Sequence, residues 1–251
     1  MSNPDEEIII TRRQLWKGIW LADNPDPIKS SDELPNGRNK VSDFLRSLLP
    51  NSSPSSSKGV IKYAIIIGHN EKSPGAYAPY PVGKSEFVFN SSIASRMLKL
   101  ADNNPNVQVK VFKRKKMSRY SLEIDECYRR VNAWLKGHPK KKCFALELHF
   151  NWLSGAGRVE MIHYPNSQVG KYMAGGLLEK FARLMGAPVD KTKLITRGKN
   201  ERGGRSLWAC SCPIVMPEPF DCTNNYHLLR VDQLGEEVFA ETYMSLIPIL
   251  D

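Results

Sequence analysis

Ionisable side chains directly follow three apolar runs in the sequence. The pairs are run 60–67 with His69, run 143–148 with His149, and run 213–216 with Glu218. Short apolar runs rich in β-branched residues predict buried strands, and the carboxyl ends of neighbouring parallel strands meet at one edge of a sheet. If these strands are parallel neighbours, His69, His149 and Glu218 converge there.

The chemistry available to such a group is that of a catalytic metal. Two imidazoles and one carboxylate form a stable Zn²⁺ site with an open coordination position, where the pKa of a bound water falls and a carbonyl is polarised. Glu86 precedes a predicted helix at 91–102, so its loop can return over the same edge. A glutamate outside the metal shell suits proton transfer. Glu218 fits that role because flanking prolines restrict its backbone.

Each of these residues also has a plainer interpretation when it is considered alone. A single histidine after a strand is commonly a structural hydrogen-bonding group, and a loop glutamate is commonly solvated. The other three histidines receive no role. They are His138 in an exposed Gly-His-Pro turn, His163 at a strand end that could lie near the site, and His227 in a surface loop.

Hydrophobic periodicity predicts an α/β fold with a mainly parallel twisted sheet and helices on both faces. The predicted strands are 60–67, 107–112, 143–148, 157–163 and 213–216, and the predicted helices are 91–102, 121–135, 170–185 and 236–246. Gly186 follows the third helix and suits its carboxyl-terminal cap.

A serine-rich stretch at 51–58 predicts a flexible linker between two unequal parts. The first part, 1–50, is a small and mostly helical segment with expected helices at 12–22 and 43–49. Its apolar content is too low for a robust independent core, so it is a small binding module, a docking segment or a piece packed on the main domain. The second part, 59–251, carries the predicted metal site and is expected to be the catalytic domain.

The chain is basic, with 36 Lys and Arg against 26 Asp and Glu, for a formal net charge of +10. Such a charge attracts polyanions, including nucleic acid and an anionic cell envelope. The basic runs 113–116 and 140–142 are not interleaved with aromatic side chains, and no zinc-finger, RNA-recognition or P-loop motif occurs. We therefore expect no specific nucleic-acid partner. Salt-sensitive DNA binding without lysis of cell-wall substrate would favour the nucleic-acid alternative.

The amino-terminal residues are acidic and polar, unlike a secretory signal, and no run approaches the ~20 apolar residues of a membrane helix. The five cysteines are an odd number, so they cannot all pair within one chain. We interpret them as free thiols and expect synthesis in a reducing compartment, the cytoplasm.

Four segments carry the candidate residues in a fixed order. They are Ile-Ile-Ile-Gly-His-Asn at 65–70 with Pro-Gly-Ala at 74–76, Ser-Glu-Phe-Val-Phe-Asn at 85–90, Leu-Glu-Leu-His-Phe-Asn at 146–151, and Val-Met-Pro-Glu-Pro-Phe at 215–220 with Asn224 after it. Together they resemble zinc-dependent N-acetylmuramoyl-L-alanine amidases of phage lysins and bacterial cell-wall hydrolases, over about residues 60–250. Arg202-Gly203-Gly204 is similar to a phage-type element before the last strand.

This resemblance implies a zinc hydrolase of peptidoglycan that cleaves the amide between N-acetylmuramic acid and the L-alanine of the stem peptide. It implies that His69, Glu86 and His149 are the Zn²⁺ ligands and that Glu218 is the catalytic glutamate. We expect Asn151 and Arg202 to contribute to substrate binding. Two positions depart from the family pattern. Glu147 stands where a small residue is usual, so we expect an additional carboxylate near the metal, and Asn70-Glu71 replaces a Gly-Gly pair.

An anionic, peptidoglycan-bearing envelope is the partner that these observations together predict. The chain is expected to act on the cell wall after release through a membrane lesion, as a phage lysin does, or after delivery with a virion or secretion system. Two alternatives remain within this setting. One is a zinc peptidase that cuts a stem-peptide bond, and the other is a non-catalytic envelope-binding protein, although all four key residues are present.

Overall fold

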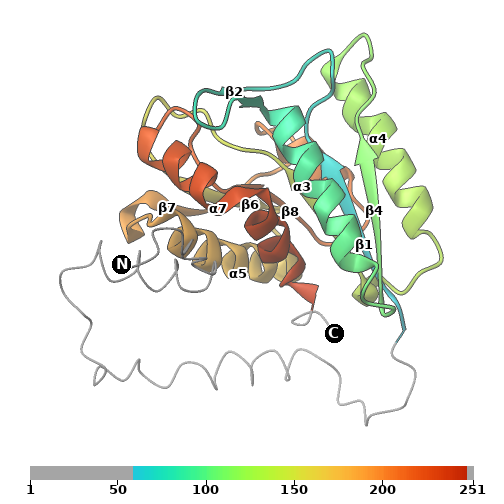
Figure 1. Ribbon diagram of the computed structural model, residues 1–251. Helices are drawn as coiled ribbons and strands as arrows, with labels where there is room; N and C mark the ends of the chain where they lie inside the picture. Colours follow the sequence, from blue (N-terminus) through green and yellow to red (C-terminus); the bar gives the residue numbers. More distant parts are fainter. Residues whose placement is uncertain (1–58, 248–251) are drawn as a thin grey trace, which may run out of the picture. The chain divides into compact units, whose positions relative to one another are not determined.

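The computed structural model describes residues 59–247, so the predictions for the segment 1–50 and the linker 51–58 lie outside the described residues. Six strands form one sheet in the order β4-β1-β5-β8-β6-β7 (Figure 1). Their bounds are β1 Ile61–Ile67, β4 Val107–Lys113, β5 Cys143–Leu148, β6 Val159–His163, β7 Thr192–Thr196 and β8 Ile214–Glu218. The strands β4, β1, β5 and β8 run parallel, whereas β6 pairs antiparallel with β8 and parallel with β7. The predicted mainly parallel sheet is confirmed.

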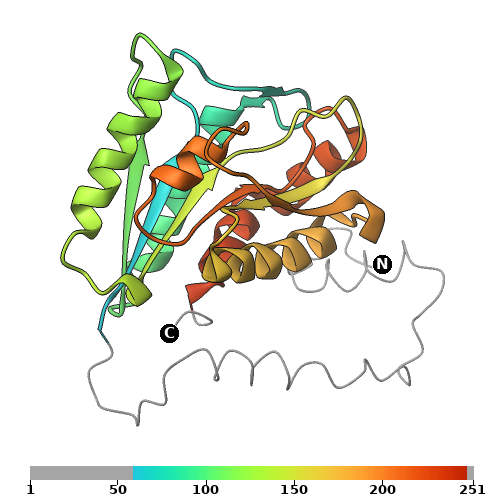
Figure 2. The same cartoon turned by 180° about the vertical axis from the view of Figure 1, so that it is seen from behind.

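Helices cover both faces of this sheet, as the sequence predicts (Figures 1 and 2). One face packs against α3 (Glu86–Ala101), α5 (Gln168–Met185) and α7 (Asn225–Met244). The other packs against α4 (Tyr120–Leu135) and α6 (Gly204–Ala209). A short hairpin of β2 (Tyr77–Ala78) and β3 (Lys84–Ser85) precedes α3, and single 3₁₀ turns η1 (Lys140–Lys142) and η2 (Val189–Lys191) precede β5 and β7.

The central strands are buried on both sides, which explains their continuous apolar sequences. In β1, Ile65 and Ile67 point into the cluster beneath α3, α5 and α7, while Ile66 points into the cluster beneath α4. All six residues of β5 are buried, including one glutamate, Glu147. The carboxyl end of β5 therefore lies at the centre of the sheet, between the ends of β1 and β8.

Helix caps account for several boundaries. Ser85 accepts a hydrogen bond from the amide of Val88 and begins α3 at Glu86, so Glu86 is a helical residue and the prediction of a loop position was wrong. Gly186 ends α5 in the left-handed conformation with φ 62°, which confirms the predicted cap. Gly235, with φ 67°, interrupts α7, so the predicted final helix from 236 is only its second half.

Candidate functional site

Three side chains meet at the carboxyl edge of the sheet. His69 lies just beyond β1, His149 just beyond β5, and Glu86 at the start of α3. Their potential ligand atoms all lie within 4.8 Å of one another, and they are the one such group of three found among residues 59–247. The Glu86 carboxylate bridges the two rings, with Oε2 3.2 Å from Nε2 of His69 and Oε1 2.7 Å from Nδ1 of His149.

Two glycines leave the space that these side chains occupy. A Cβ at Gly68 would stand 2.0 Å from Nε2 of His149. Gly75 has φ +80°, and a Cβ there would stand 2.6 Å from Oε2 of Glu86 and 2.7 Å from Cδ2 of His69. Both positions therefore need a residue without a side chain, which explains the Gly-His and Pro-Gly-Ala segments.

Backbone amides orient the central carboxylate. Glu86 accepts hydrogen bonds from the amides of Ala76, at 3.3 Å, and Phe150, at 3.2 Å. Burial acts to raise the pKa of Glu86, but the hydrogen bonds from His149 and His69 outweigh it and lower that pKa to about 2. An ionised, buried carboxylate between two imidazoles is a donor set that fits Zn²⁺.

Glu218 is the last residue of β8 and lines the same cleft as the three potential ligands. The amide of His149 donates to the carbonyl oxygen of Pro217 at 3.3 Å, which joins the end of β5 to the end of β8. Burial raises the pKa of Glu218 to about 7; the nearby His149 opposes this rise, while the charges of Glu86 and Glu160 add to it. Such a carboxyl group can both accept and release a proton near neutral pH.

The cleft that contains these residues has a volume of about 530 Å³. Its wall includes the ring of Trp152, which is 60% exposed, and the ring of Tyr120, which is 56% exposed. Its cationic lining residues are Arg158, Lys193, Arg197 and Arg202. The cleft thus offers aromatic surface and positive charge beside the three potential ligands.

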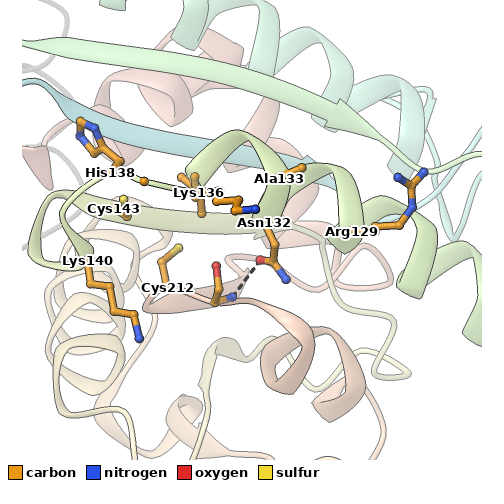
Figure 3. Close-up of a pocket in the computed structure, with 11 residues that line it drawn as sticks. Arg129, Asn132, Ala133, Lys136, His138, Lys140, Cys143 and Cys212 are labelled. Atoms are coloured by element: carbon orange, nitrogen blue, oxygen red, sulfur yellow. Dashed lines mark hydrogen bonds between the residues drawn. The ribbon is translucent and has the colours of Figure 1, made fainter.

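A second pocket, of about 450 Å³, lies at the start of β5, at the opposite end of that strand from His149 (Figure 3). Cys143 and Cys212 line it together with Lys136, Lys140 and His138. None of the predicted site residues lies there.

All five cysteines are free thiols, as predicted.

The two residues predicted to bind substrate both line the cleft. Asn151 is buried, and its amide group donates to Oε2 of Glu160 at 3.1 Å. Arg202 is exposed and close enough to Glu218 to act on its pKa. Their part in substrate binding stays a prediction.

The sequence reasoning missed Glu160, a buried carboxylate on β6 that faces Glu218 in the antiparallel register. A charged residue inside the apolar run 159–162 was the available signal. Because β6 runs antiparallel to β8, its first residues lie at the edge of the site and its last residue, His163, lies away from it. The expectation that His163 could be near the site was therefore wrong. His227 is also not in a surface loop, because it is buried in α7 and accepts a hydrogen bond from the amide of Asp221 at 3.0 Å.

Comparison with solved structures identifies the fold. The catalytic domain of the CD27L endolysin targeting Clostridia difficile aligns with a TM-score of 0.58 and 21% identity, over 75% of this chain and 97% of that one. The CwlD amidase of Clostridioides difficile aligns with a TM-score of 0.59 and 15% identity, over 76% and 98%.

The chain has the fold of N-acetylmuramoyl-L-alanine amidase catalytic domains. The amidase Ami1 of Mycobacterium smegmatis aligns similarly, with a TM-score of 0.57 and 15% identity, over 78% of this chain and 98% of that one. No protein-family model matches the sequence, and no curated protein matches it significantly. The likeness to the amidase fold therefore comes from structure, at low sequence identity, and it agrees with the resemblance of the four sequence segments.

Proposed function

We propose that this protein is a zinc-dependent N-acetylmuramoyl-L-alanine amidase. The observation that carries the proposal is the convergence of His69, Glu86 and His149 with Glu218 in one cleft of an amidase fold. The three potential ligands would hold Zn²⁺, which, when bound, supplies Lewis-acid activation of water and of the scissile carbonyl.

The chain's own residues supply the proton transfers. Glu218 accepts a proton from the water that attacks the lactyl carbonyl carbon of N-acetylmuramic acid. The bond between that carbon and the nitrogen of L-alanine then breaks, and Glu218 returns the proton to the departing nitrogen. Burial raises the pKa of Glu218, which makes its carboxylate a stronger base for the first step.

Binding of the substrate is proposed for the walls of the cleft. Asn151 and Arg202 both line the cleft that contains Glu218. Arg202 offers an exposed cation to the carboxylates of a stem peptide, and Asn151 holds Glu160 in place through its amide group. The net charge of +10 favours approach to an anionic envelope.

We further propose that the chain is a phage-type lysin made in the cytoplasm, with residues 59–251 as the catalytic domain and residues 1–50 as a separate segment. The likeness to an endolysin catalytic domain supports the first part. No helix within residues 59–247 is long and apolar enough to cross a membrane.

Mass analysis of digested peptidoglycan tests the reaction directly. An amidase releases stem peptides that begin with the free amine of L-alanine and leaves glycan strands with intact lactyl groups. New amines within the stem peptide or its cross-link would instead show a zinc peptidase. No release of soluble products, with the protein still bound to the wall, would show an envelope-binding protein. Glu218→Gln should retain zinc but lose at least ~100-fold in rate; full activity in this variant would rule out the mechanism.

A further inference from the structure

Glu147 is a fully buried carboxylate in the central strand of the sheet. Its relative exposure is 0%, and it stands two residues before His149 in β5. Residues two apart on a strand share a face, so the Glu147 side chain points to the same side of the sheet as His149. A buried carboxylate is costly unless it is paired and hydrogen-bonded, so its contacts decide what it does.

The contacts of Glu147 come from three directions. Oε1 of Glu147 lies 3.0 Å from Nε2 of His149. Arg114, just beyond β4, donates to the same oxygen, and the hydroxyl of Tyr128 in α4 donates to Oε2. Both partners are themselves buried. The carboxylate is therefore held in one orientation relative to the imidazole.

Arg114 is fixed in turn by the residues around it. Its guanidinium donates to the hydroxyl of Tyr120 at 2.7 Å and to Oγ of Ser206 at 3.1 Å. These partners come from α4 and α6, so both helices on this face of the sheet help to position Glu147. Arg114 is thus not a solvated member of the basic run 113–116.

We infer that Glu147 is a positioning residue for His149, an inference that rests on the proposed metal site. Glu147 accepts the Nε2 proton of the imidazole, which would leave Nδ1, the nitrogen beside Glu86, with a lone pair to offer to a bound metal. Nδ1 lies 2.7 Å from Oε1 of Glu86, on the other side of the ring from Glu147. Carboxylates that accept the second ring proton of a metal-bound histidine fix its tautomer and increase its basicity.

The same geometry argues against Glu147 as a fourth ligand. Oε1 of Glu147 lies beside Nε2, whereas the carboxylate of Glu86, a potential ligand, lies beside Nδ1. The group found among the described residues contains His69, Glu86 and His149, and it does not include Glu147. The extra carboxylate expected near the metal is present, but it lies behind a ligand.

Paired substitutions separate positioning from simple structural support. Glu147→Gln and Glu147→Leu both leave the charge of Arg114 without its partner, so they share that cost to stability. Only the glutamine keeps an oxygen that can accept from Nε2 of His149. We expect Glu147→Leu to weaken zinc affinity roughly 10–100-fold and Glu147→Gln to weaken it less. Competition with a chromogenic chelator measures both, and the d–d spectrum of the Co²⁺-substituted protein should change more in the leucine variant.

Equal zinc affinity in the two variants, with equal loss of thermal stability, would show a structural role and overturn the inference. If either variant does not fold, ¹⁵N NMR of the zinc-loaded wild-type protein decides the matter. A proton on Nε2 of His149 and metal on Nδ1 supports the inference, and the reverse arrangement overturns it. Wild-type protein that binds no zinc would overturn the proposed metal site itself, and this inference with it.

Discussion

Gly68 lies so close to His149 that a Cβ at position 68 would stand 2.0 Å from Nε2 of the imidazole. The two residues follow adjacent parallel strands, and the amide of Gly68 donates to the carbonyl oxygen of Leu148 at 3.2 Å. The backbone after β1 therefore forms one wall of the space in which the His149 ring sits.

Gly68→Ala should accordingly displace the His149 ring. We expect at least a tenfold loss of zinc affinity, because a shift of even a few tenths of an ångström disturbs metal geometry, together with a stability loss of about 1–3 kcal/mol from overpacking. Zinc titration and urea unfolding measure the two effects. Gly175→Ala is the matched control, since a Cβ there meets nothing within 4 Å in the middle of α5. Unchanged zinc affinity in Gly68→Ala would contradict the proposed ligand role of His149.

Removal of the metal should lower the melting temperature. The zinc-free site holds an ionised, buried Glu86 between two imidazoles, and a ligand that binds only the folded state stabilises it by about 4 kcal/mol at a thousandfold excess over Kd. Scanning calorimetry with a chelator, followed by added zinc, should show a reversible shift. In His69→Ala, which lacks one potential ligand, the chelator should change the melting temperature much less. Identical melting curves with and without chelator would mean that no metal is bound.

The zinc-free protein should also lose stability between weakly acidic and neutral pH because of Glu218. Its folded pKa of about 7 lies above the ordinary value of 4.5, so the folded state retains a proton that the unfolded state releases. The resulting stability is present below pH 4.5 and is lost as the pH rises through 7. Glu218→Gln removes this loss. The free energy of unfolding of the variant, relative to that of the wild type, should therefore rise by up to about 3 kcal/mol as the pH increases across that range. Urea unfolding of both proteins in the presence of a chelator, at pH 5 and at pH 8, measures this change. The same difference in unfolding free energy at both pH values would refute the raised pKa of Glu218.

Glu160→Gln should shift the acid side of the pH–rate profile to lower pH. The negative charge of Glu160 raises the pKa of Glu218, and its removal makes the base easier to ionise. The glutamine can still accept the hydrogen bond from Asn151, but it loses the ion pair of Glu160 with Arg158. The measurement is the rate of peptide release from peptidoglycan between pH 5 and pH 8, with Arg183→Ala, an exposed residue of α5, as the control. A shift to higher pH, or none, would show that the charge of Glu160 does not raise the pKa of Glu218.

The convergence of His69, His149 and Glu218 was predictable because their strands are mostly apolar, and such strands pack in parallel between helices. The position of Glu86 was harder to predict from the sequence. The cap at Ser85 begins α3 at Glu86, whereas the apolar periodicity indicates a helix only from residue 91. Resemblance to the amidases, rather than spacing, supplied its assignment.

Other features depend on contacts between distant parts of the chain. Glu160 was missed because the reversed direction of β6 brings the beginning of a strand to the edge where strand ends were expected. The strand β7 lies at the edge of the sheet and is only partly buried, so it lacks the apolar run that marks the central strands. The basic run 113–116 gave no sign that Arg114 is buried, because its partner, Glu147, lies 33 positions away.

The order of the site residues along the chain has a consequence for synthesis. His69 and Glu86 emerge from the ribosome early, but β8 pairs with β5 and carries Glu218 near the end of the described domain. A growing chain that already contains the three potential ligands therefore still lacks Glu218, the proposed catalytic base. On the proposed function, the site becomes complete only after β8, the last strand of the sheet in the sequence, has been made.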